Sequence, residues 1–264
     1  MLKLRQGKFL GTVDFYQATP EATISVTRYN PDDRNSDLVH YHEHANFYFI
    51  LAGGSVEKRS RTEEELGTGS LRFYRAGEYH QNIRQGKEAK SINLEINSDW
   101  LRDCGSPEHN FENIDKSPFA GMLVLKIYKE LLAADAASSY SVDLLLMDLV
   151  GAGNSETDRS SPGWIRQVNS LLLDRWNEFL SLDELALESG VNPITISKHF
   201  HRYFNCTLGE YMRKIKVERA LALIRTTELP LTDIAYQCGF ADQSHFIRCF
   251  KQYTGFLPAH FRKV

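Results

Sequence analysis

Residues Leu231 to Arg262 read LTDIAYQCGFADQSHFIRCFKQYTGFLPAHFR, and this stretch decides the fold. Apolar residues from Leu231 to Ala235 have helical spacing, and Gly239 ends this helix because glycine adopts a positive φ at little cost. A second helix is predicted from Asp242 or Gln243, and its apolar face carries Phe246, Cys249, Phe250 and Tyr253. Its other face holds the donors Ser244, His245, Arg248 and Lys251. Two short helices joined by a glycine turn are typical of a helix-turn-helix that reads the major groove.

The same unit occurs a second time, earlier in the chain. Leu182 to Ala186 corresponds to the first helix, and Gly190 corresponds to Gly239, at an offset of 49 residues before the turn and 50 after it. Ser181 and Glu184 form a capping box that sets the start of this helix. The second helix of this copy has the apolar-face positions Ile196, His199, Phe200 and Tyr203, and the outward positions Ile194, Thr195, Ser197, Lys198 and His201. One helix pair alone would be a weak signal, but a repeated supersecondary unit is far more specific.

Residues 164–264 resemble the double helix-turn-helix DNA-binding domain of the AraC/XylS family of bacterial transcription regulators. The matching residues are Ile234–Ala235, Gly239–Phe240, Ser244–His245–Phe246, Phe250–Lys251 and Gly255 to Arg262. The resemblance implies that a long helix, from Leu208 to Arg225, joins the two units. It also implies that both recognition helices enter successive major grooves on one face of double-stranded DNA. RNA polymerase is then an expected partner, and we expect an activator because activation is the commoner role in that family.

Polar and basic side chains on the two recognition helices are the predicted DNA contacts. The base-reading candidates are Ile194, Thr195, Ser197 and Lys198 on the first helix, and Gln243, Ser244, His245 and Arg248 on the second. Arg248 is favoured because two guanidinium donors match guanine O6 and N7, although a phosphate contact or a solvated position is the alternative. Lys198 stands at the corresponding place and is less specific geometrically. His201, Arg202 and Lys251 are predicted to contact phosphates, which position the protein without specifying sequence.

Length and charge fit a two-domain DNA-binding protein. The chain has 264 residues and a net charge of −3, and its 42% hydrophobic and 25% charged content is ordinary for a globular protein. Residues 163–264 hold 13 Lys and Arg against 10 Asp and Glu, whereas the remainder holds 18 against 24. The basic excess therefore lies in the part assigned to DNA, as phosphate contact requires.

Cysteine usage and hydropathy predict a cytoplasmic protein. The four cysteines have no paired spacing, which predicts no disulfide framework, and Cys238 and Cys249 read as small apolar residues on helix faces. The first residues are interrupted by Lys3, Arg5 and Lys8, so no signal-peptide core is expected. The most apolar run, residues 144–150, is far below membrane-spanning length, and no membrane partner is expected.

The first hundred residues read as β structure. Strands are predicted at Thr12–Tyr16, Ala22–Tyr29, Asn46–Leu51, Ser70–Tyr74 and Lys90–Ile96. In the last of these, Ile92, Leu94 and Ile96 alternate with Ser91, Asn93 and Glu95, which predicts a half-buried strand. Several short strands at this spacing favour a small sandwich or barrel. The acidic run Glu63 to Glu65 is expected in a solvated loop.

Two histidine segments resemble the two motifs of the cupin barrel. His40–Tyr41–His42–Glu43–His44 comes first, and Arg75 to His80 follows. His42 and His44 are two residues apart, so both would point to one face of a strand. With His80 they are the candidate metal ligands, and three imidazoles suit Zn, Fe, Cu or Ni. The acidic ligand of the first cupin motif is missing, however, and Arg75 replaces the proline of the second.

We therefore expect no metal and no other cofactor. The barrel is instead predicted to sense a small-molecule effector through the pocket residues His42, His44, Tyr48, Arg75 and His80, with a purely structural role of the histidines as the alternative. Arg75 would favour a carboxylate or another anion, although a solvated arginine fits the sequence equally well.

Between the two predicted domains lie two apolar helices and a linker. Residues 99–115 read as a loop-rich connection, and Ser117–Pro118 start a helix with the apolar stripe Phe119, Met122, Leu123, Ile127 and Leu131. A second helix, Val142 to Val150, is nearly all apolar. These helices would pack on the barrel, on each other or on a second chain, and a homodimer is the expectation. Gly151 to Pro162 is polar and rich in Gly and Ser, as linkers are.

The sequence thus predicts an α+β multidomain protein. Its parts are a cupin-like ligand-sensing barrel (1–115), a helical pair for dimerisation (116–150), a linker (151–162) and an AraC-type DNA-binding domain (163–264). The predicted function is a non-enzymatic, ligand-responsive transcription regulator. One alternative is a metal-dependent cupin enzyme fused to a DNA-binding module, and another is an architectural DNA-binding protein with a structural barrel.

Overall fold

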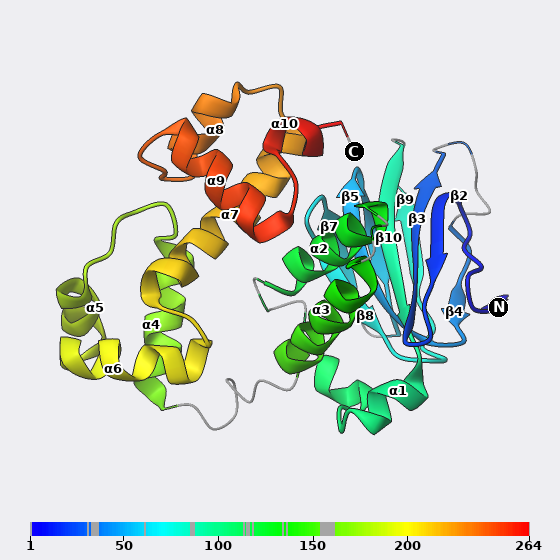
Figure 1. Cartoon of the computed structure of the whole chain (residues 1–264), viewed down its shortest axis with the longest axis horizontal. Helices are drawn as coiled ribbons and strands as arrows, with labels where there is room; N and C mark the ends of the chain where they lie inside the picture. The colour runs from blue at the N-terminus through cyan, green and yellow to red at the C-terminus, as the bar shows by residue number, and fades with distance from the viewer. Residues whose placement is uncertain are drawn as a thin grey trace. The chain divides into compact units, whose positions relative to one another are not determined.

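The computed structural model forms two compact units, one built mainly from Met1–Asn154 and the other mainly from Ser155–Ile224 and Glu228–Phe261. The first unit is mostly β and the second is all α (Figure 1), which confirms the predicted α+β multidomain class. The structure describes residues 2–30, 32, 37–60, 62–84, 88–112, 114, 117, 119–133, 135, 137–153 and 162–263. Among them, no helix is both long and apolar enough to cross a membrane.

Three sheets make up the β part of the first unit. The strands are β1 (Leu2–Leu4), β2 (Thr12–Ala18), β3 (Ala22–Tyr29), β4 (His40–His42), β5 (Ala45–Ala52), β6 (Gly54–Lys58), β7 (Glu63–Gly67), β8 (Leu71–Tyr74), β9 (Gln81–Arg84) and β10 (Ala89–Ile96). Their order is β2-β3-β10-β5-β8 in the largest sheet, β7-β6-β9 in the second and β1-β4 in the third. The five predicted strands are all present. The Glu63–Glu65 run is not a loop, since it begins β7 and pairs with β6 through Glu63 and Lys58.

Strand β10 is buried on both faces, so the prediction of a half-buried strand is wrong. Its apolar side faces α2 (Ala120–Ala133). Leu94 pairs with Phe47 of β5, and Ile92 pairs with Phe49. The Phe49 ring lies against Gly121 of α2, where a Cβ added to the glycine would be 2.7 Å from the ring. Its polar side faces inward, where Asn93 Nδ2 donates to Thr27 Oγ1 at 3.0 Å. The polar face is buried because side chains from all three sheets meet there instead of solvent.

Helices cover the apolar face of the large sheet (Figure 1). After α1 (Ser98–Asp103) and a 3-10 turn (Glu108–Phe111), α2 packs against β10 and against α3 (Ser138–Gly153). The predicted helix start at Ser117–Pro118 falls partly outside the described residues, because Pro118 is not among them. Helix α3 includes residues 151–153 of the predicted linker, and residues 154–161 of that linker also lie outside the described part.

The second unit contains two copies of one helix pair, as the repeat predicted. Its helices are α4 (Gly163–Asp174), α5 (Leu182–Ser189), α6 (Pro193–Phe204), α7 (Leu208–Thr226), α8 (Leu231–Gln237), α9 (Gln243–Thr254) and α10 (Pro258–Phe261). Ser181 and Glu184 form the predicted capping box, with Glu184 N donating to Ser181 Oγ at 3.2 Å. Gly190 and Gly239 both have φ of 69°, as expected for glycines that end a helix. Helix α7 is the predicted long helix between the pairs.

Candidate nucleic-acid interface and interior histidine site

Helix α6 is positioned so that one face is buried and the other is open to solvent. Asn192 caps its start by accepting a hydrogen bond from Ile194 N at 2.8 Å, and Pro193 occupies the first turn, where its missing N–H is not needed. Ile196 and Phe200 are buried in the core of the unit. The side chains on the other face are exposed, namely Ile194, Ser197, Lys198, His201 and Arg202, while Thr195 is half-buried.

Helix α9 repeats this arrangement. Asp242 accepts from His245 N at 2.7 Å, and the buried face carries the predicted residues Phe246, Cys249, Phe250 and Tyr253. The exposed side chains are Ser244, Arg248 and Lys251, while Gln243 and His245 are half-buried. Burial of one face thus leaves a polar, basic row on the other, as a major-groove helix requires.

Two predicted base-reading residues also have contacts inside the unit. Gln243 Oε1 accepts from Thr232 Oγ1 at 2.8 Å, which ties the start of α9 to α8. The His245 ring meets Phe240 edge to face, with centroids 5.5 Å apart. These contacts limit the freedom of both side chains, so Arg248 and Ser244 are the less constrained of the four candidates on α9.

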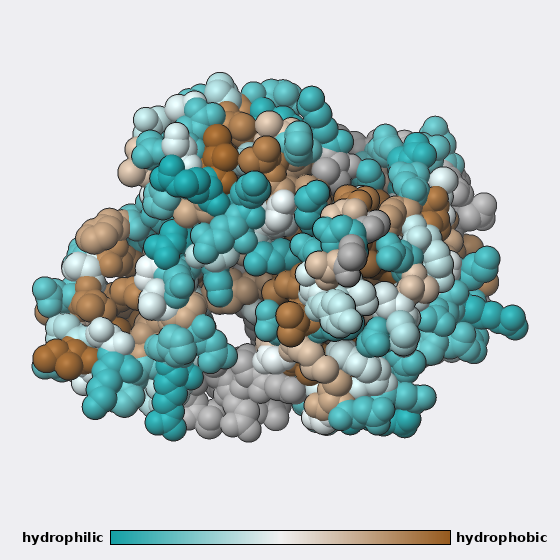
Figure 2. Space-filling view, viewed as in Figure 1, coloured by the Kyte–Doolittle hydropathy of each residue, from teal (hydrophilic) through white to brown (hydrophobic). Residues whose placement is uncertain are grey.

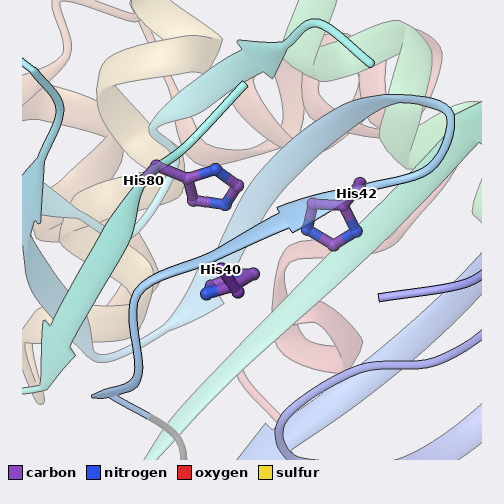
Figure 3. A group of neighbouring side chains, drawn as sticks. All are labelled: His40, His42 and His80. Carbon is purple, nitrogen blue, oxygen red and sulfur yellow. The ribbon is translucent and has the colours of Figure 1, made fainter. Parts of the chain in front are cut away.

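In the first unit, His42 and His80 lie close together as predicted, but the third histidine beside them is His40 and not His44 (Figure 3). His40 and His42 are the two ends of the short strand β4, and His80 directly precedes β9. His44 lies beyond the end of β4, is only half-buried and is not part of this group. The predicted pair His42 and His44 is therefore corrected to His40 and His42. The same period of two fits both pairs, which is why the sequence did not distinguish them.

Aromatic and charged side chains hold the interior histidines in place. His80 stacks on Tyr74 at a centroid distance of 3.6 Å, and Tyr74 OH donates to Glu57 Oε1 at 2.6 Å. Burial raises the pKa of Tyr74 well above its ordinary value, so its phenol stays protonated as a donor. Arg84 lies over the Tyr29 ring at 3.7 Å. The predicted pocket residue Tyr48 also lines this space, which has a free volume of only about 10 Å³.

Arg75, the fifth predicted pocket residue, lies elsewhere. It is exposed and forms an ion pair with Glu112. It lines an open surface pocket of about 430 Å³ together with Arg59, Phe73 and Glu78. The structure therefore separates the predicted ligand residues into two sites: a very small interior space with His42, Tyr48 and His80, and an open, mixed-charge pocket with Arg75.

Comparison with known proteins bears directly on the helical unit. A family model described as a helix-turn-helix domain matches residues 185–264. The chain is similar to the probable transcription factor PqrA of Proteus vulgaris, with 34% identity over 87 residues, which is 33% of this chain and 71% of PqrA. The chain belongs to the AraC/XylS family of transcription regulators.

Other relatives of this AraC/XylS protein match different shares of it. The regulator GbdR of Pseudomonas aeruginosa is 29% identical over 94 residues, 36% of this chain, and the match spans only 26% of GbdR. The transcriptional activator RhaR of an Enterobacter species is 20% identical over 273 residues, which covers 96% of this chain and 95% of RhaR. The similarity is thus strongest in the helical unit and extends weakly over the barrel.

Proposed function

We propose that this protein is a transcription regulator that reads a specific DNA sequence with α6 and α9 and responds to a small molecule bound by its first unit. The observation that carries the proposal is the duplicated helix pair, in which each second helix buries its apolar face and exposes a polar and basic one. Membership of the AraC/XylS family supports it. From the same family membership we also propose that the protein activates transcription and contacts RNA polymerase.

Within this proposal, the exposed residues have two roles. Arg248 reads a guanine, because it is exposed on the outer face of α9 and offers two parallel donors. Ile194 contacts a thymine methyl from the exposed start of α6, and Ser197, Lys198 and Ser244 lie beside these two on the same faces. His201, Arg202 and Lys251 sit further along the helices and contact phosphates.

The test is DNA binding by the full chain after selection of its preferred duplex from a random pool. Arg248→Ala should weaken binding to that duplex by about 1–3 kcal/mol and relax the preference at one base position. Lys251→Ala is the matched control, because it removes a cation from the same helix. It should weaken all duplexes alike and reduce the salt slope by about 1. Fluorescence anisotropy at several salt concentrations measures both, and an unchanged base preference in Arg248→Ala contradicts the assignment.

We infer that an organic effector binds at the open Arg75 pocket and not between the histidines. A drug-sized ligand needs about 300–1,000 Å³, and the surface pocket offers about 430 Å³ against about 10 Å³ inside. Arg75 pairs there with Glu112, so a ligand carboxylate would replace Glu112 as its partner. In a screen of metabolites by thermal shift, hits on the wild type should be lost in Arg75→Ala. Hits that survive this substitution would place the effector elsewhere.

The enzyme alternative is less well supported by the geometry. A cupin enzyme needs room for a substrate beside its metal, and the free volume around the described histidines is about 10 Å³. The four-part division at residues 115, 150 and 162 remains our proposal for how these functions are distributed along the chain.

A further inference from the structure

Three buried imidazoles meet in the first unit, at a place where three separate sheets come together. His40 and His42 belong to β4, and His80 is joined to His40 by two backbone hydrogen bonds of 3.0 Å. One nitrogen of each ring lies within 4.8 Å of the others, and the three side chains point toward one another (Figure 3). All three are between 2% and 5% exposed. Buried imidazole nitrogens need hydrogen-bond or metal partners, because burial removes the water that would otherwise bind them.

The hydrogen bonds of two rings fix which nitrogen carries the lone pair. His40 Nδ1 is 2.7 Å from Leu38 O, and His80 Nδ1 is 3.0 Å from Glu78 O. A carbonyl oxygen only accepts, so both Nδ1 atoms are protonated and both Nε2 atoms carry lone pairs. A metal-binding histidine shows this same arrangement, with its second nitrogen donating to a carbonyl or a carboxylate.

All three rings are buried, so their nitrogen atoms are removed from water. His80 Nε2 is buried and has no hydrogen-bond partner among the described residues. The interior therefore holds at least one buried acceptor atom, His80 Nε2, that no described residue compensates.

The third ring is accompanied by a buried carboxylate. His42 Nδ1 lies 3.5 Å from Glu95 Oε1, and both atoms are buried without a hydrogen-bond partner in the described part of the chain. The other oxygen of Glu95 accepts from Gly7 N at 2.7 Å, which holds the carboxylate in place. Glu95 comes from β10, so it supplies an acidic group from a different strand than the first cupin motif would.

The space among these groups fits a single ion. Its volume of about 10 Å³ is about that of one water-sized sphere, too small for an organic molecule. The nearest cations have partners of their own: Arg84 pairs with Asp37 at 3.5 Å, and Arg59 pairs with Glu57 and Glu78. The carboxylate of Glu95 offsets part of the charge of a bound cation.

We propose that His40, His42 and His80 bind one divalent transition-metal ion, with Glu95 as the buried carboxylate that orients the His42 ring. Three imidazoles favour a transition metal such as Zn²⁺ or Fe²⁺ over Mg²⁺ and Ca²⁺, which prefer oxygen ligands. His40 and His42 lie on β4, His80 directly precedes β9 and Glu95 lies on β10, and these three strands belong to three different sheets. This proposal is independent of DNA reading, because every residue in it belongs to the first unit.

The test measures metal content and metal affinity of the full chain, prepared without a polyhistidine tag. After the chain is stripped with a chelator, Zn²⁺ and the spectroscopic probe Co²⁺ are titrated separately. The wild type should take up one ion per chain, show Co²⁺ absorption bands typical of nitrogen ligands, and melt at a higher temperature with the ion than without it. These readouts need no variant, so they stand even where a substitution weakens the fold.

Substitutions then assign the ligands. His40→Gln and His80→Gln should lose stoichiometric binding and the metal-dependent rise in melting temperature. Glu95→Gln should weaken binding by about 10–100-fold. His44→Gln is the matched control, because it removes a histidine from the same segment but outside the group, and it should bind as the wild type does. Equal loss in His44→Gln and His40→Gln, or a wild type that binds no tighter than His40→Gln, would overturn the proposal and leave a buried water as the occupant.

Discussion

Asn205 ends the first recognition helix in a conformation that most residues avoid. Its φ is 50°, and it is the one non-glycine residue with a positive φ among those the structure describes. In the second copy the equivalent residue is Gly255, with φ of 79°, fifty residues later. Both residues cap the last turn through their own N–H, Asn205 to His201 O and Gly255 to Lys251 O, each at 2.9 Å. The same backbone geometry is thus built from two different residues.

This difference between the copies predicts the effect of two substitutions. Asn205→Ala should lower the free energy of unfolding of the helical unit by about 1 kcal/mol, because alanine tolerates left-handed backbone less well than asparagine does. The free energy of unfolding of Asn205→Gly should be within about 0.5 kcal/mol of the wild-type value. Glycine adopts the left-handed conformation with less strain, but it also makes the unfolded chain more flexible, and the two effects offset each other. Urea unfolding followed by circular dichroism measures both. Equal stability of the alanine and asparagine chains would show that the turn relaxes at no cost.

The sequence did not determine which histidines form the buried group. A period of two places His40, His42 and His44 on one face of an extended strand, so any adjacent pair satisfies it. The choice depends on where β4 ends, and β4 ends at His42. Glu95 is more than fifty residues further along the chain and comes near His42 because β10 pairs with β5, which follows β4, and no local pattern describes that pairing. His80 belongs to the group as the cupin-like motif indicates, because that motif is a local signal.

At the scale of elements, the helices of the second unit were well predicted, whereas half of the strands were not. The helix ends depend on local chemistry: Ser181 with Glu184 at one start, and Gly190 and Gly239 at two ends. An additional capping box, Thr207 with Glu210, starts α7, with Glu210 N donating to Thr207 Oγ1 at 3.3 Å. Strands β1, β4, β6, β7 and β9 are short and owe their existence to partners elsewhere in the chain, so the sequence around them carries little signal.

Helix α7 carries a half-buried carboxylate that makes the stability of its unit depend on pH. Burial raises the pKa of Glu218 from its ordinary 4.5 to about 7 in the folded chain. Between pH 4.5 and about 7, the Glu218 carboxyl loses its proton in the unfolded chain but keeps it in the folded chain. Stability contributed by the protonated form is therefore complete below about pH 4.5 and is lost as the pH rises to about 7.

Glu218→Gln should remove this dependence. At pH 8 the free energy of unfolding of the variant should exceed that of wild type by about 1–3 kcal/mol. The lower figure is favoured because the Glu218 side chain is partly solvated. The difference should vanish near pH 4.5, where both chains are neutral at this position. Urea unfolding at several pH values measures it. Glu228→Gln, the same change at an exposed position after α7, is the control. A wild-type-like pH profile in Glu218→Gln would mean that Glu218 is ionised in the folded chain.

At the scale of the whole molecule, α3 leaves apolar side chains uncovered. Its inner face buries Val142, Leu146 and Leu149, while Tyr140, Leu144 and Met147 follow the outer face at i, i+4 and i+7 and are 76%, 69% and 50% exposed. Figure 2 shows hydrophobic atoms at the surface in this region. A contiguous apolar row of this kind on a helix is a common protein contact surface. A second copy of the chain is the partner we propose, since homodimerisation was predicted from the same apolar helix.

Leu144→Glu should therefore convert a dimer into a monomer in sedimentation experiments, because it places two charges in a self-complementary interface. Leu187→Glu is the matched control: Leu187 is 85% exposed, lies on α5 in the other unit, and should leave the dimer intact. A wild-type chain that sediments as a monomer at micromolar concentration would contradict the proposal, and so would an equal effect of the two substitutions.

The side chains inside and outside the barrel determine where this chain can be cut or fused to another protein. The barrel interior mixes polar and aromatic side chains, and a separate apolar layer lies outside the barrel, between the large sheet and α2. Phe47 and Phe49 contribute to that layer and are fully buried. A recombinant chain cut at residue 115 would expose these rings to water and should aggregate. Engineered fusions should therefore be joined after α3, so that the large sheet keeps the two helices that cover it.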